Sequence, residues 1–327
     1  MTTLVTGGMG FVGSHFVRAA CAAGMHVLIL DDLSGGASPS LPLPSGATLV
    51  VGDIGDRSRV QTLCREFHVE SVVHFAGKIQ VGESVKRPEL YFDVNLMRSL
   101  HLLEAVRQAG ISNFIFSSTA AVYGVPEHVP IPESAPKDPV NPYGATKLAF
   151  EHALQAYGDA HGLRWAALRY FNAAGAHPDG TLGENHEPET HLIPLVLDAG
   201  LGRRPPLQLF GEDYATPDGT CVRDYIHVCD LADAHLVALA QLKAGRARIV
   251  ANLGTGHGIT VRQVLDAAAE VLGRPIPHQI ASRRAGDPAA LVADPSRARE
   301  LLGFVAQRSD LRTLIEDALR SRRGGLV

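Results

Sequence analysis

The sequence LVTGGMGFVGSH, residues 4–15, joins a short strand-like run to a helical pattern that continues to Ala23. Its glycines at positions 7, 10 and 13 have G-x-x-G-x-x-G spacing. Glycine permits a tight turn and a close backbone approach to a pyrophosphate, and the following helix N-terminus offers free N–H groups with a partial positive charge. A glycine-rich turn without a ligand is the alternative. The stretch predicts a dinucleotide site that includes Gly7, Gly10, Phe11, Val12 and Gly13.

An acidic residue ends the next predicted strand, His26–Asp31. In dinucleotide-binding folds an acid about 20 residues beyond the glycines accepts hydrogen bonds from the cofactor ribose and repels a 2′-phosphate. Asp31 therefore favours NAD over NADP. Asp53 and Ile54 follow the third predicted strand and are weaker candidates for the adenine end, because aspartate is common in turns.

Short β-branched runs alternate with helical patterns through the first half of the chain. This order predicts a parallel sheet with helices on both faces, a doubly wound Rossmann-type α/β fold. The predicted strands are Leu4–Thr6, His26–Asp31, Thr48–Gly52, Ser71–Phe75, Asn113–Ser117 and Trp165–Arg169, and the predicted helices are Phe11–Ala23, Asp56–Phe67, Asn95–Gln108 and Tyr143–Ala160.

After about Phe171 the sequence changes to loops rich in glycine and proline with shorter elements between them. We expect an NAD-binding domain at residues 1–172 and a smaller α/β domain at residues 173–327 that binds the substrate. A predicted strand, Val222–His227, and a predicted helix, Leu231–Gln241, indicate that residues 221–242 return to the first domain.

The charge, the apolar segments and the cysteines of the chain argue against several classes of partner and of cellular location. The 327 residues carry a formal net charge of −4 and no block of Lys or Arg, so nothing indicates binding to nucleic acid or to a membrane. The chain shows no signal peptide and no membrane-spanning apolar run, and its four cysteines are scattered, so we expect a cytoplasmic protein with reduced thiols. Without an H-E-x-x-H motif we expect no metal. Small molecules are the expected partners.

A tyrosine and a lysine lie four residues apart in a predicted helix that starts at Pro142. This spacing puts Tyr143 and Lys147 on one helix face, where the ammonium and a positive nicotinamide both favour the phenolate. Thr119 follows a strand at the edge where open α/β sheets bind ligands, so its hydroxyl can reach Tyr143 and a substrate. The pattern predicts a catalytic Thr119, Tyr143 and Lys147. The alternative is an exposed Tyr-Lys pair beside a solvated threonine.

Eight motifs occur along the chain in the order TGGMGFVGSH, HFAG, VGESV, FSSTAAVYG, NPYGATK, RYFNAAGAHP, VRDYIHVCDLADAH and NLGTG. With them, residues 3 to about 304 resemble the UDP-glucose 4-epimerases of the extended short-chain dehydrogenase/reductase superfamily. The resemblance implies that Tyr143 takes the proton from O4 while the C4 hydride passes to tightly bound NAD. The 4-keto sugar then turns over, and the returning hydride inverts C4 and regenerates NAD.

The resemblance also implies further binding residues. Those expected at the cofactor are Phe75, Ala76, Gly77, Asn95 and Ser117, besides Tyr143 and Lys147. Those expected at the UDP-sugar are Asn172, His191, Leu192, Gln208, Phe210, Arg223, Arg284, Asp287 and Leu291, besides Thr119. It further implies a homodimer that pairs through the helices near Asn95–Gln108 and Tyr143–Ala160.

Two positions argue against related chemistries. Ala120 and Ala121 follow Thr119, where related dehydratases carry an Asp-Glu pair for acid–base steps. Methyl groups cannot perform those steps, so dehydration and decarboxylation are disfavoured.

Lys78 lies one place earlier than the lysine of many epimerases, and we assign it no role.

Two other departures bear on the substrate. His191 stands where several epimerases have Asn beside the diphosphate, so its titration would make binding depend on pH. Leu291 stands where a larger Tyr excludes 2-N-acetyl groups, which leaves room for UDP-N-acetylglucosamine. An epimerase of UDP-N-acetylhexosamine or of UDP-uronate, and more remotely a non-catalytic NAD-sensing module, are therefore the open alternatives.

Overall fold

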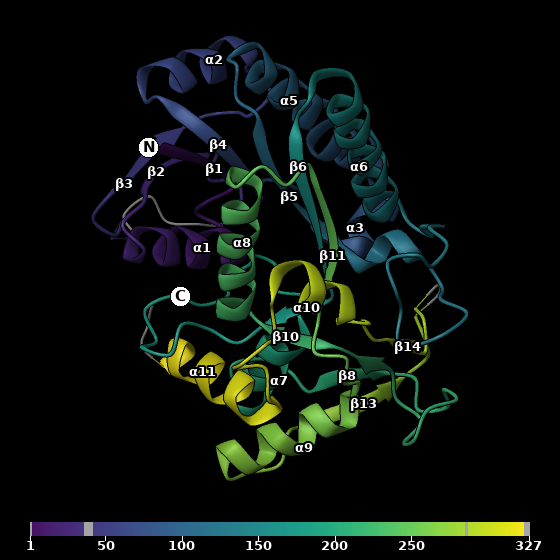
Figure 1. Cartoon of the computed structure of the whole chain (residues 1–327). Coiled ribbons are helices and arrows are strands. Elements are labelled where there is room, and N and C mark those ends of the chain that lie inside the picture. Colours follow the sequence, from purple (N-terminus) through teal and green to yellow (C-terminus); the bar gives the residue numbers. More distant parts are fainter. Residues whose placement is uncertain (1, 36–41, 285–286, 324–327) are drawn as a thin grey trace.

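The computed structural model describes residues 2–35, 42–284 and 287–323 (Figure 1). Its main sheet has seven parallel strands in the order β11-β6-β5-β4-β1-β2-β3. These strands are β1 (Thr2–Thr6), β2 (His26–Asp31), β3 (Ala47–Val51), β4 (Val69–His74), β5 (Asn113–Thr119), β6 (Arg164–Tyr170) and β11 (Arg248–Leu253). The doubly wound Rossmann-type fold predicted from the sequence is confirmed.

Helices cover both faces of this sheet. Alternate side chains of each strand point to opposite faces, and in the central strands both sets are apolar and pack against helices. Val5 and Ile29 pack with α1 (Phe11–Ala22) and α8 (Val228–Lys243) in one core cluster. Leu4 and Leu28 pack on the other face with α2 (Arg57–Glu66), α5 (Ser99–Gln108) and α6 (Pro142–His161). The apolar runs of the central strands are therefore buried on both sides.

The remaining elements fall into two groups, before and after residue 171. Before it lie α3 (Val81–Lys86), α4 (Pro88–Tyr91), the π-helix η1 (Phe92–Arg98) and the 3₁₀ helix η2 (Ala120–Tyr123). After it lie β7 (Asn172–Ala174), α7 (Leu192–Gly200), β8 (Leu207–Phe210), β9 (Val222–Arg223), β10 (Tyr225–His227), β12 (Ile259–Thr260), α9 (Val261–Leu272), β13 (His278–Ala281), β14 (Ala290–Leu291), α10 (Ser296–Leu302) and α11 (Leu311–Arg323). Helices α7, α9 and α11 share a third core cluster with β8.

The single strand predicted at Val222–His227 is wrong. Strands β9 and β10 belong to two different small sheets, β12-β9-β14 and β10-β7. The residue between them, Asp224, is fully buried, and its carboxylate accepts the backbone N–H groups of Thr255, Gly256 and Ala293. Hydrogen bonds from distant segments thus break the strand at a point that no local pattern marks.

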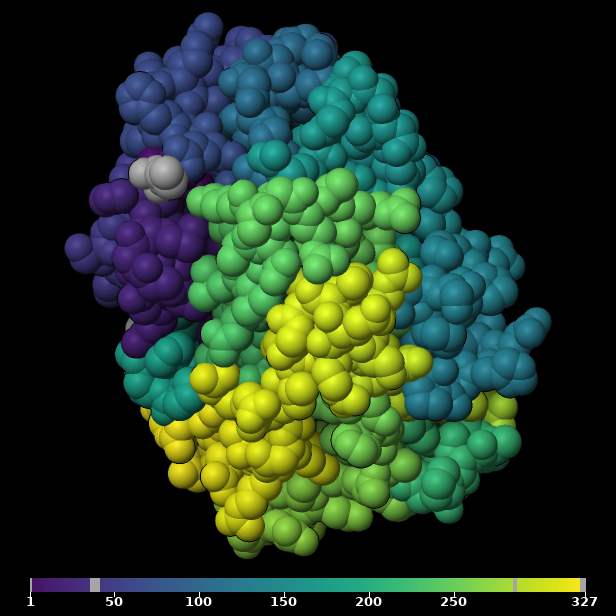
Figure 2. Space-filling model, viewed as in Figure 1, coloured from purple at the N-terminus to yellow at the C-terminus, as the bar shows by residue number. Residues whose placement is uncertain are grey.

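Two later segments lie with the first part of the chain. Helix α8 packs against α1, and β11 pairs with β6 as an edge strand of the main sheet. Strand β11 is not among the strands predicted from the sequence. Figure 2 shows the later segments, in green and yellow, packed against the purple and blue first half on this face. The domain limits at residues 172 and 173 stay a prediction.

Within the described ranges, no helix combines the length and the apolar character that crossing a membrane requires.

An ion pair buried beneath α6 ties this helix to the sheet. The side chains of Arg169 on β6 and Glu151 on α6 are 3% and 5% exposed. Ser118 donates a further hydrogen bond to Glu151, and Arg169 donates one to the hydroxyl of Tyr123 at 2.9 Å. The pair lies one helical turn beyond Lys147 and therefore holds the part of α6 that carries the predicted catalytic residues.

Replacing Arg169 by Met should lower the free energy of unfolding by about 3–5 kcal/mol, because Glu151 would stay buried without a cation. Urea denaturation measures this change. The matched control is Arg312→Met, which breaks the exposed Arg312–Glu316 pair (71% and 40% exposed). It should cost less than about 1 kcal/mol. Equal losses in the two variants would contradict the anchoring role of the buried pair.

Candidate active site

A cavity of about 1370 Å³ lies where β1, β2, β4 and β5 end, between the main sheet and the segments after residue 171. Its volume exceeds the roughly 300–1,000 Å³ of a typical small-molecule pocket, so it has room for two ligands. Every residue expected to bind cofactor or substrate lines this cavity except Asn95. The three expected catalytic residues line it as well.

The glycine turn leaves no room for side chains at two of its positions. A Cβ atom on Gly7, whose φ is +69°, would lie 2.4 Å from the backbone nitrogen of Ala76, and one on Gly13 would lie 2.1 Å from the Gly7 oxygen. Helix α1 begins after Gly10 with no side-chain cap. The first N–H groups of the helix therefore face the cavity next to glycines that carry no side chain. Together they form a cradle that fits a dinucleotide pyrophosphate.

Asp31 stands at the end of β2 beside this turn. One of its carboxylate oxygens accepts the N–H of Met9 and the other accepts the N–H of Leu33, each at 2.9 Å. Burial raises the pKa of Asp31, and the two hydrogen bonds oppose this shift. The carboxylate keeps acceptor capacity for a ribose hydroxyl.

Asp53 and Ile54, which the sequence analysis gave as weaker candidates for the adenine end, both line the cavity. Asp53 forms an ion pair with Arg98 at 2.5 Å and accepts the N–H of Gly55 at 2.7 Å. Ile54 is almost fully buried and lines the wall. The carboxylate of Asp53 is thus already engaged by the protein.

Asn95 lies behind the cavity wall. Its side-chain amide accepts from the backbone N–H of Lys78 at 2.8 Å and donates to the carbonyl of the same residue at 2.9 Å. It is buried, and its oxygen lies 3.1 Å from where a Cβ on Gly77 would be. Asn95 therefore holds the backbone of Gly77 and Lys78 in place. The ammonium of Lys78 lies 3.4 Å from the Ser34 hydroxyl.

Tyr143, Lys147 and Thr119 meet at the middle of the cavity. The ammonium of Lys147 donates to the carbonyl of Ser117 at 3.0 Å and lies 5.9 Å from the centre of the Tyr143 ring. Burial lowers the pKa of Lys147 to about 8, although Glu151 opposes this. Burial raises the pKa of Tyr143, and its hydrogen bond with Thr119 opposes that rise. The protein's own groups thus keep the phenol neutral, and a phenolate needs an additional positive charge nearby.

The opposite end of the cavity carries two arginines. Arg223 donates to the carbonyls of Val222 and Pro288 at 2.8 and 3.0 Å and forms an ion pair with Asp287. The exposed guanidinium of Arg284 lies 4.0 Å from the centre of the Phe210 ring. Forked guanidinium groups suit the oxygens of a diphosphate, so this end can hold an anion.

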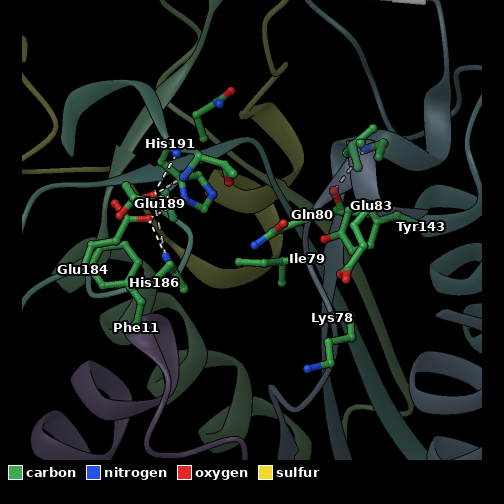
Figure 3. A pocket seen from close by; sticks show the side chains of 18 of the residues that line it. Phe11, Lys78, Ile79, Gln80, Glu83, Tyr143, Glu184, His186, Glu189 and His191 are labelled. Carbon is green, nitrogen blue, oxygen red and sulfur yellow. Dashed lines mark hydrogen bonds and ion pairs between the residues drawn. The ribbon is translucent and has the colours of Figure 1, made fainter. Parts of the chain in front are cut away.

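A cluster of side chains that the sequence motifs did not indicate lies beside His191. Glu184, His186 and Glu189 line the same wall, and Figure 3 shows them gathered around His191 on the side away from Tyr143. Their ligand atoms and that of His191 all lie within 4.8 Å of one another. The expectation of no metal rested on missing motifs. The repeated His and Glu of GENHEPETHL were the available signal.

Comparison with known proteins gives consistent matches. Residues 3–254 match the family described as NAD dependent epimerase/dehydratase. The UDP-glucose 4-epimerase of Azospirillum brasilense is 50% identical over 98% of this chain and 91% of its own length. That of Corynebacterium glutamicum is 49% identical over 97% of this chain and 94% of its own length.

Solved structures agree with these matches. The UDP-glucose 4-epimerase from Brucella ovis in complex with NAD has a TM-score of 0.94 at 46% identity and covers 97% of each chain. The one from Bifidobacterium longum in complex with NAD+ and UDP has a TM-score of 0.94 at 37% identity and covers 99% of each chain.

Two glycine variants separate the fold of the turn from its binding function. Gly13→Ala should lower the free energy of unfolding by roughly 1–3 kcal/mol, because its Cβ would overlap the Gly7 carbonyl. Gly10→Ala has no protein atom nearer than 3.4 Å to its Cβ. It should keep the stability of the cofactor-free chain and weaken retention of NAD, since a methyl group would lie against the pyrophosphate. Urea denaturation and NAD content measure the two effects. The explanation fails if Gly10→Ala destabilises the cofactor-free chain as much as Gly13→Ala.

Proposed function

The chain belongs to the NAD dependent epimerase/dehydratase family, and we propose that it interconverts UDP-glucose and UDP-galactose by inversion at C4. It is an NAD-dependent epimerase of UDP-hexoses. The observation that carries the proposal is one cavity that joins a dinucleotide cradle, a Tyr143–Lys147–Thr119 group and a pair of arginines. When bound, NAD accepts the C4 hydride and returns it to the opposite face of the sugar.

The glycine turn and Asp31 would hold NAD. The N–H groups at the start of α1 face the pyrophosphate, and the carboxylate of Asp31 accepts from the ribose. Phe75, Ala76 and Gly77 form the wall beside this cradle. Ser117 lies at the nicotinamide side, where its hydroxyl hydrogen-bonds with that of Tyr170.

Tyr143 moves the proton at O4 of the hexose. Its phenolate takes the proton as the alcohol is oxidised and gives it back when the ketone is reduced. The Lys147 ammonium stabilises the phenolate, and the Thr119 hydroxyl hydrogen-bonds both Tyr143 and the substrate oxygen. Ala120 lines the cavity next to this group and offers no acid or base for dehydration.

Inversion requires a firm hold on the nucleotide and a loose hold on the sugar. Arg223 and Arg284 bind the diphosphate, Asp287 binds the uridine ribose, and Leu192 with the Gln208–Phe210 backbone flanks the uracil. Asn172 and His191 add hydrogen bonds near the diphosphate, and Leu291 lies at the hexose end. Its effect on acetylated sugars stays a prediction.

We further propose a homodimer that works in the cytoplasm. The pairing surface would be formed by η1 with α5 and by α6, since Phe92 and Met97 on η1 are 42% and 55% exposed although they are large and apolar. All four cysteines are free thiols, as in proteins of a reducing compartment.

The purified protein should convert UDP-galactose to UDP-glucose without added NAD, because the cofactor is regenerated in each cycle. Tyr143→Phe should lower kcat by about 10²–10⁴-fold and leave bound NAD in place, since it removes only the base. Product analysis and NAD content measure the two effects. Tyr157→Phe, on the same helix, removes an outer hydroxyl bonded to Glu104 and should keep the wild-type rate. Full turnover by Tyr143→Phe would rule out this mechanism.

The pH profile should show the charge of Lys147. This ammonium is present below its pKa of about 8 and is lost as the pH rises through that value. Since the phenolate needs the charge, kcat/KM should fall above about pH 8. Arginine keeps its charge to pH values above about 12, so in Lys147→Arg the fall in kcat/KM should move to higher pH. The maximal kcat/KM of this variant should be lower than that of the wild type, because a guanidinium differs in shape from an ammonium. An unmoved alkaline limb in this variant would assign the fall to another group.

A further inference from the structure

Four side chains gather in the loop that leads into α7. Glu184, His186, Glu189 and His191, here the His–Glu cluster, lie across the cavity from Tyr143 (Figure 3). None of them is needed to move the proton or the hydride. The proposed function uses His191 alone among them, as a hydrogen-bond donor to the diphosphate.

The cluster directs nitrogen and oxygen atoms at one point. Nδ1 of His191 and Nδ1 of His186 both face Oε1 of Glu184, at 2.6 and 3.2 Å. The same two nitrogens lie 3.3 and 3.9 Å from Oε1 of Glu189. Ligands about 2.0–2.1 Å from a tetrahedral ion are roughly 3.3 Å from one another. The four distances, 2.6 to 3.9 Å, lie on either side of this value, so small side-chain shifts would bring the four atoms around one ion.

Hydrogen bonds within the protein leave the cluster incomplete. Oε1 of Glu184, Nδ1 of His186 and Oε2 of Glu189 are buried and form no hydrogen bond of good geometry among the described residues. Their close polar contacts are the ion-pair distances within the cluster and the one from Glu189 to Arg322. The side chain of Glu184 is only 5% exposed. Buried polar atoms of this kind are costly unless they bind something, and here three of them belong to one group.

Charge points to a cation. Without an ion, Glu184 and Glu189 raise the pKa of His191 to about 10, so its imidazole carries a proton between them. A divalent ion would replace that proton and would balance the charge of −2 carried by two carboxylates and two neutral imidazoles. The guanidinium of Arg322 lies 3.6 Å from Oε2 of Glu189 and is shared with Asp198 at 3.0 Å. Glu184 forms its ion pairs with the two histidines.

We propose that the His–Glu cluster binds one divalent transition-metal ion, with zinc favoured by the two imidazole nitrogens and two carboxylate oxygens. The ion holds residues 184–191 in a closed loop. Leu192, the first residue of α7, follows directly, and the Gln80 amide donates to the Pro188 carbonyl of the same loop at 3.3 Å. The site is structural: it fixes one wall of the cavity and touches no reacting atom.

Metal binding is tested on the NAD-containing protein after treatment with EDTA and exchange into metal-free buffer. Titration with Co²⁺ should give the intense visible absorption of a tetrahedral site with an end point of one ion per chain. Zn²⁺ should displace Co²⁺ and raise the thermal midpoint. His186→Asn and Glu184→Gln should each weaken binding at least tenfold, since each removes a ligand. His128→Asn changes an exposed histidine outside the cluster and should bind as the wild type does.

Three results would overturn the proposal. They are no uptake of Co²⁺ or Zn²⁺ by the wild type, binding by His186→Asn and Glu184→Gln as tight as that of the wild type, and an octahedral Co²⁺ spectrum. The wild-type titration decides the matter even if a variant fails to fold. Epimerase activity is not a readout, so this test and that of the proposed function fail or succeed independently.

Discussion

A turn with no space for a Cβ atom fixes the geometry of the whole site. Gly7 packs its backbone on Ala76 at the end of β4, and Gly13 packs on the Gly7 carbonyl. This brings the start of α1 to the edge of the sheet, where its N–H groups face the cavity. Asp31 supports the same turn through the Met9 N–H. One carboxylate therefore holds the cradle in shape and offers an acceptor to the ligand within it.

The catalytic group depends on a second constraint, a lysine buried against an aromatic ring. The Lys147 ammonium lies 4.7 Å from the centre of the Phe116 ring and is bonded to a main-chain carbonyl, so its position is set by β5 and not by solvent. Burial lowers the pKa of Lys147 and raises the pKa of Tyr143, so it favours the neutral form of both side chains. A site that shifts both pKa values in these directions needs the positive charge of its cofactor to make the base.

The sequence predicted those parts of the molecule that local patterns determine. Buried strands alternate with amphipathic helices over the first half, so their order and approximate limits could be predicted, and the spacing of Tyr143 and Lys147 places both on one helix face. It could not predict what distant segments decide. The break at Asp224 depends on N–H groups from residues 255, 256 and 293. Asn95 was expected at the cofactor, yet it lies behind the wall, where the oxygen and the nitrogen of its side-chain amide both hydrogen-bond to the backbone of Lys78.

The unequal grip that we propose for the two halves of a UDP-sugar rests on how Arg223 is held. A guanidinium has five N–H donors. In Arg223, three contacts within the described chain engage the carbonyls of Val222 and Pro288 and the carboxylate of Asp287. Two donors are left for a phosphate, on a side chain that is already ordered, so little conformational entropy is lost on binding. Ala120, Phe171 and Leu291 belong to one apolar cluster and line the cavity with hydrocarbon, at the end that we propose for the hexose. In that arrangement a keto sugar held by its diphosphate could turn without breaking strong contacts.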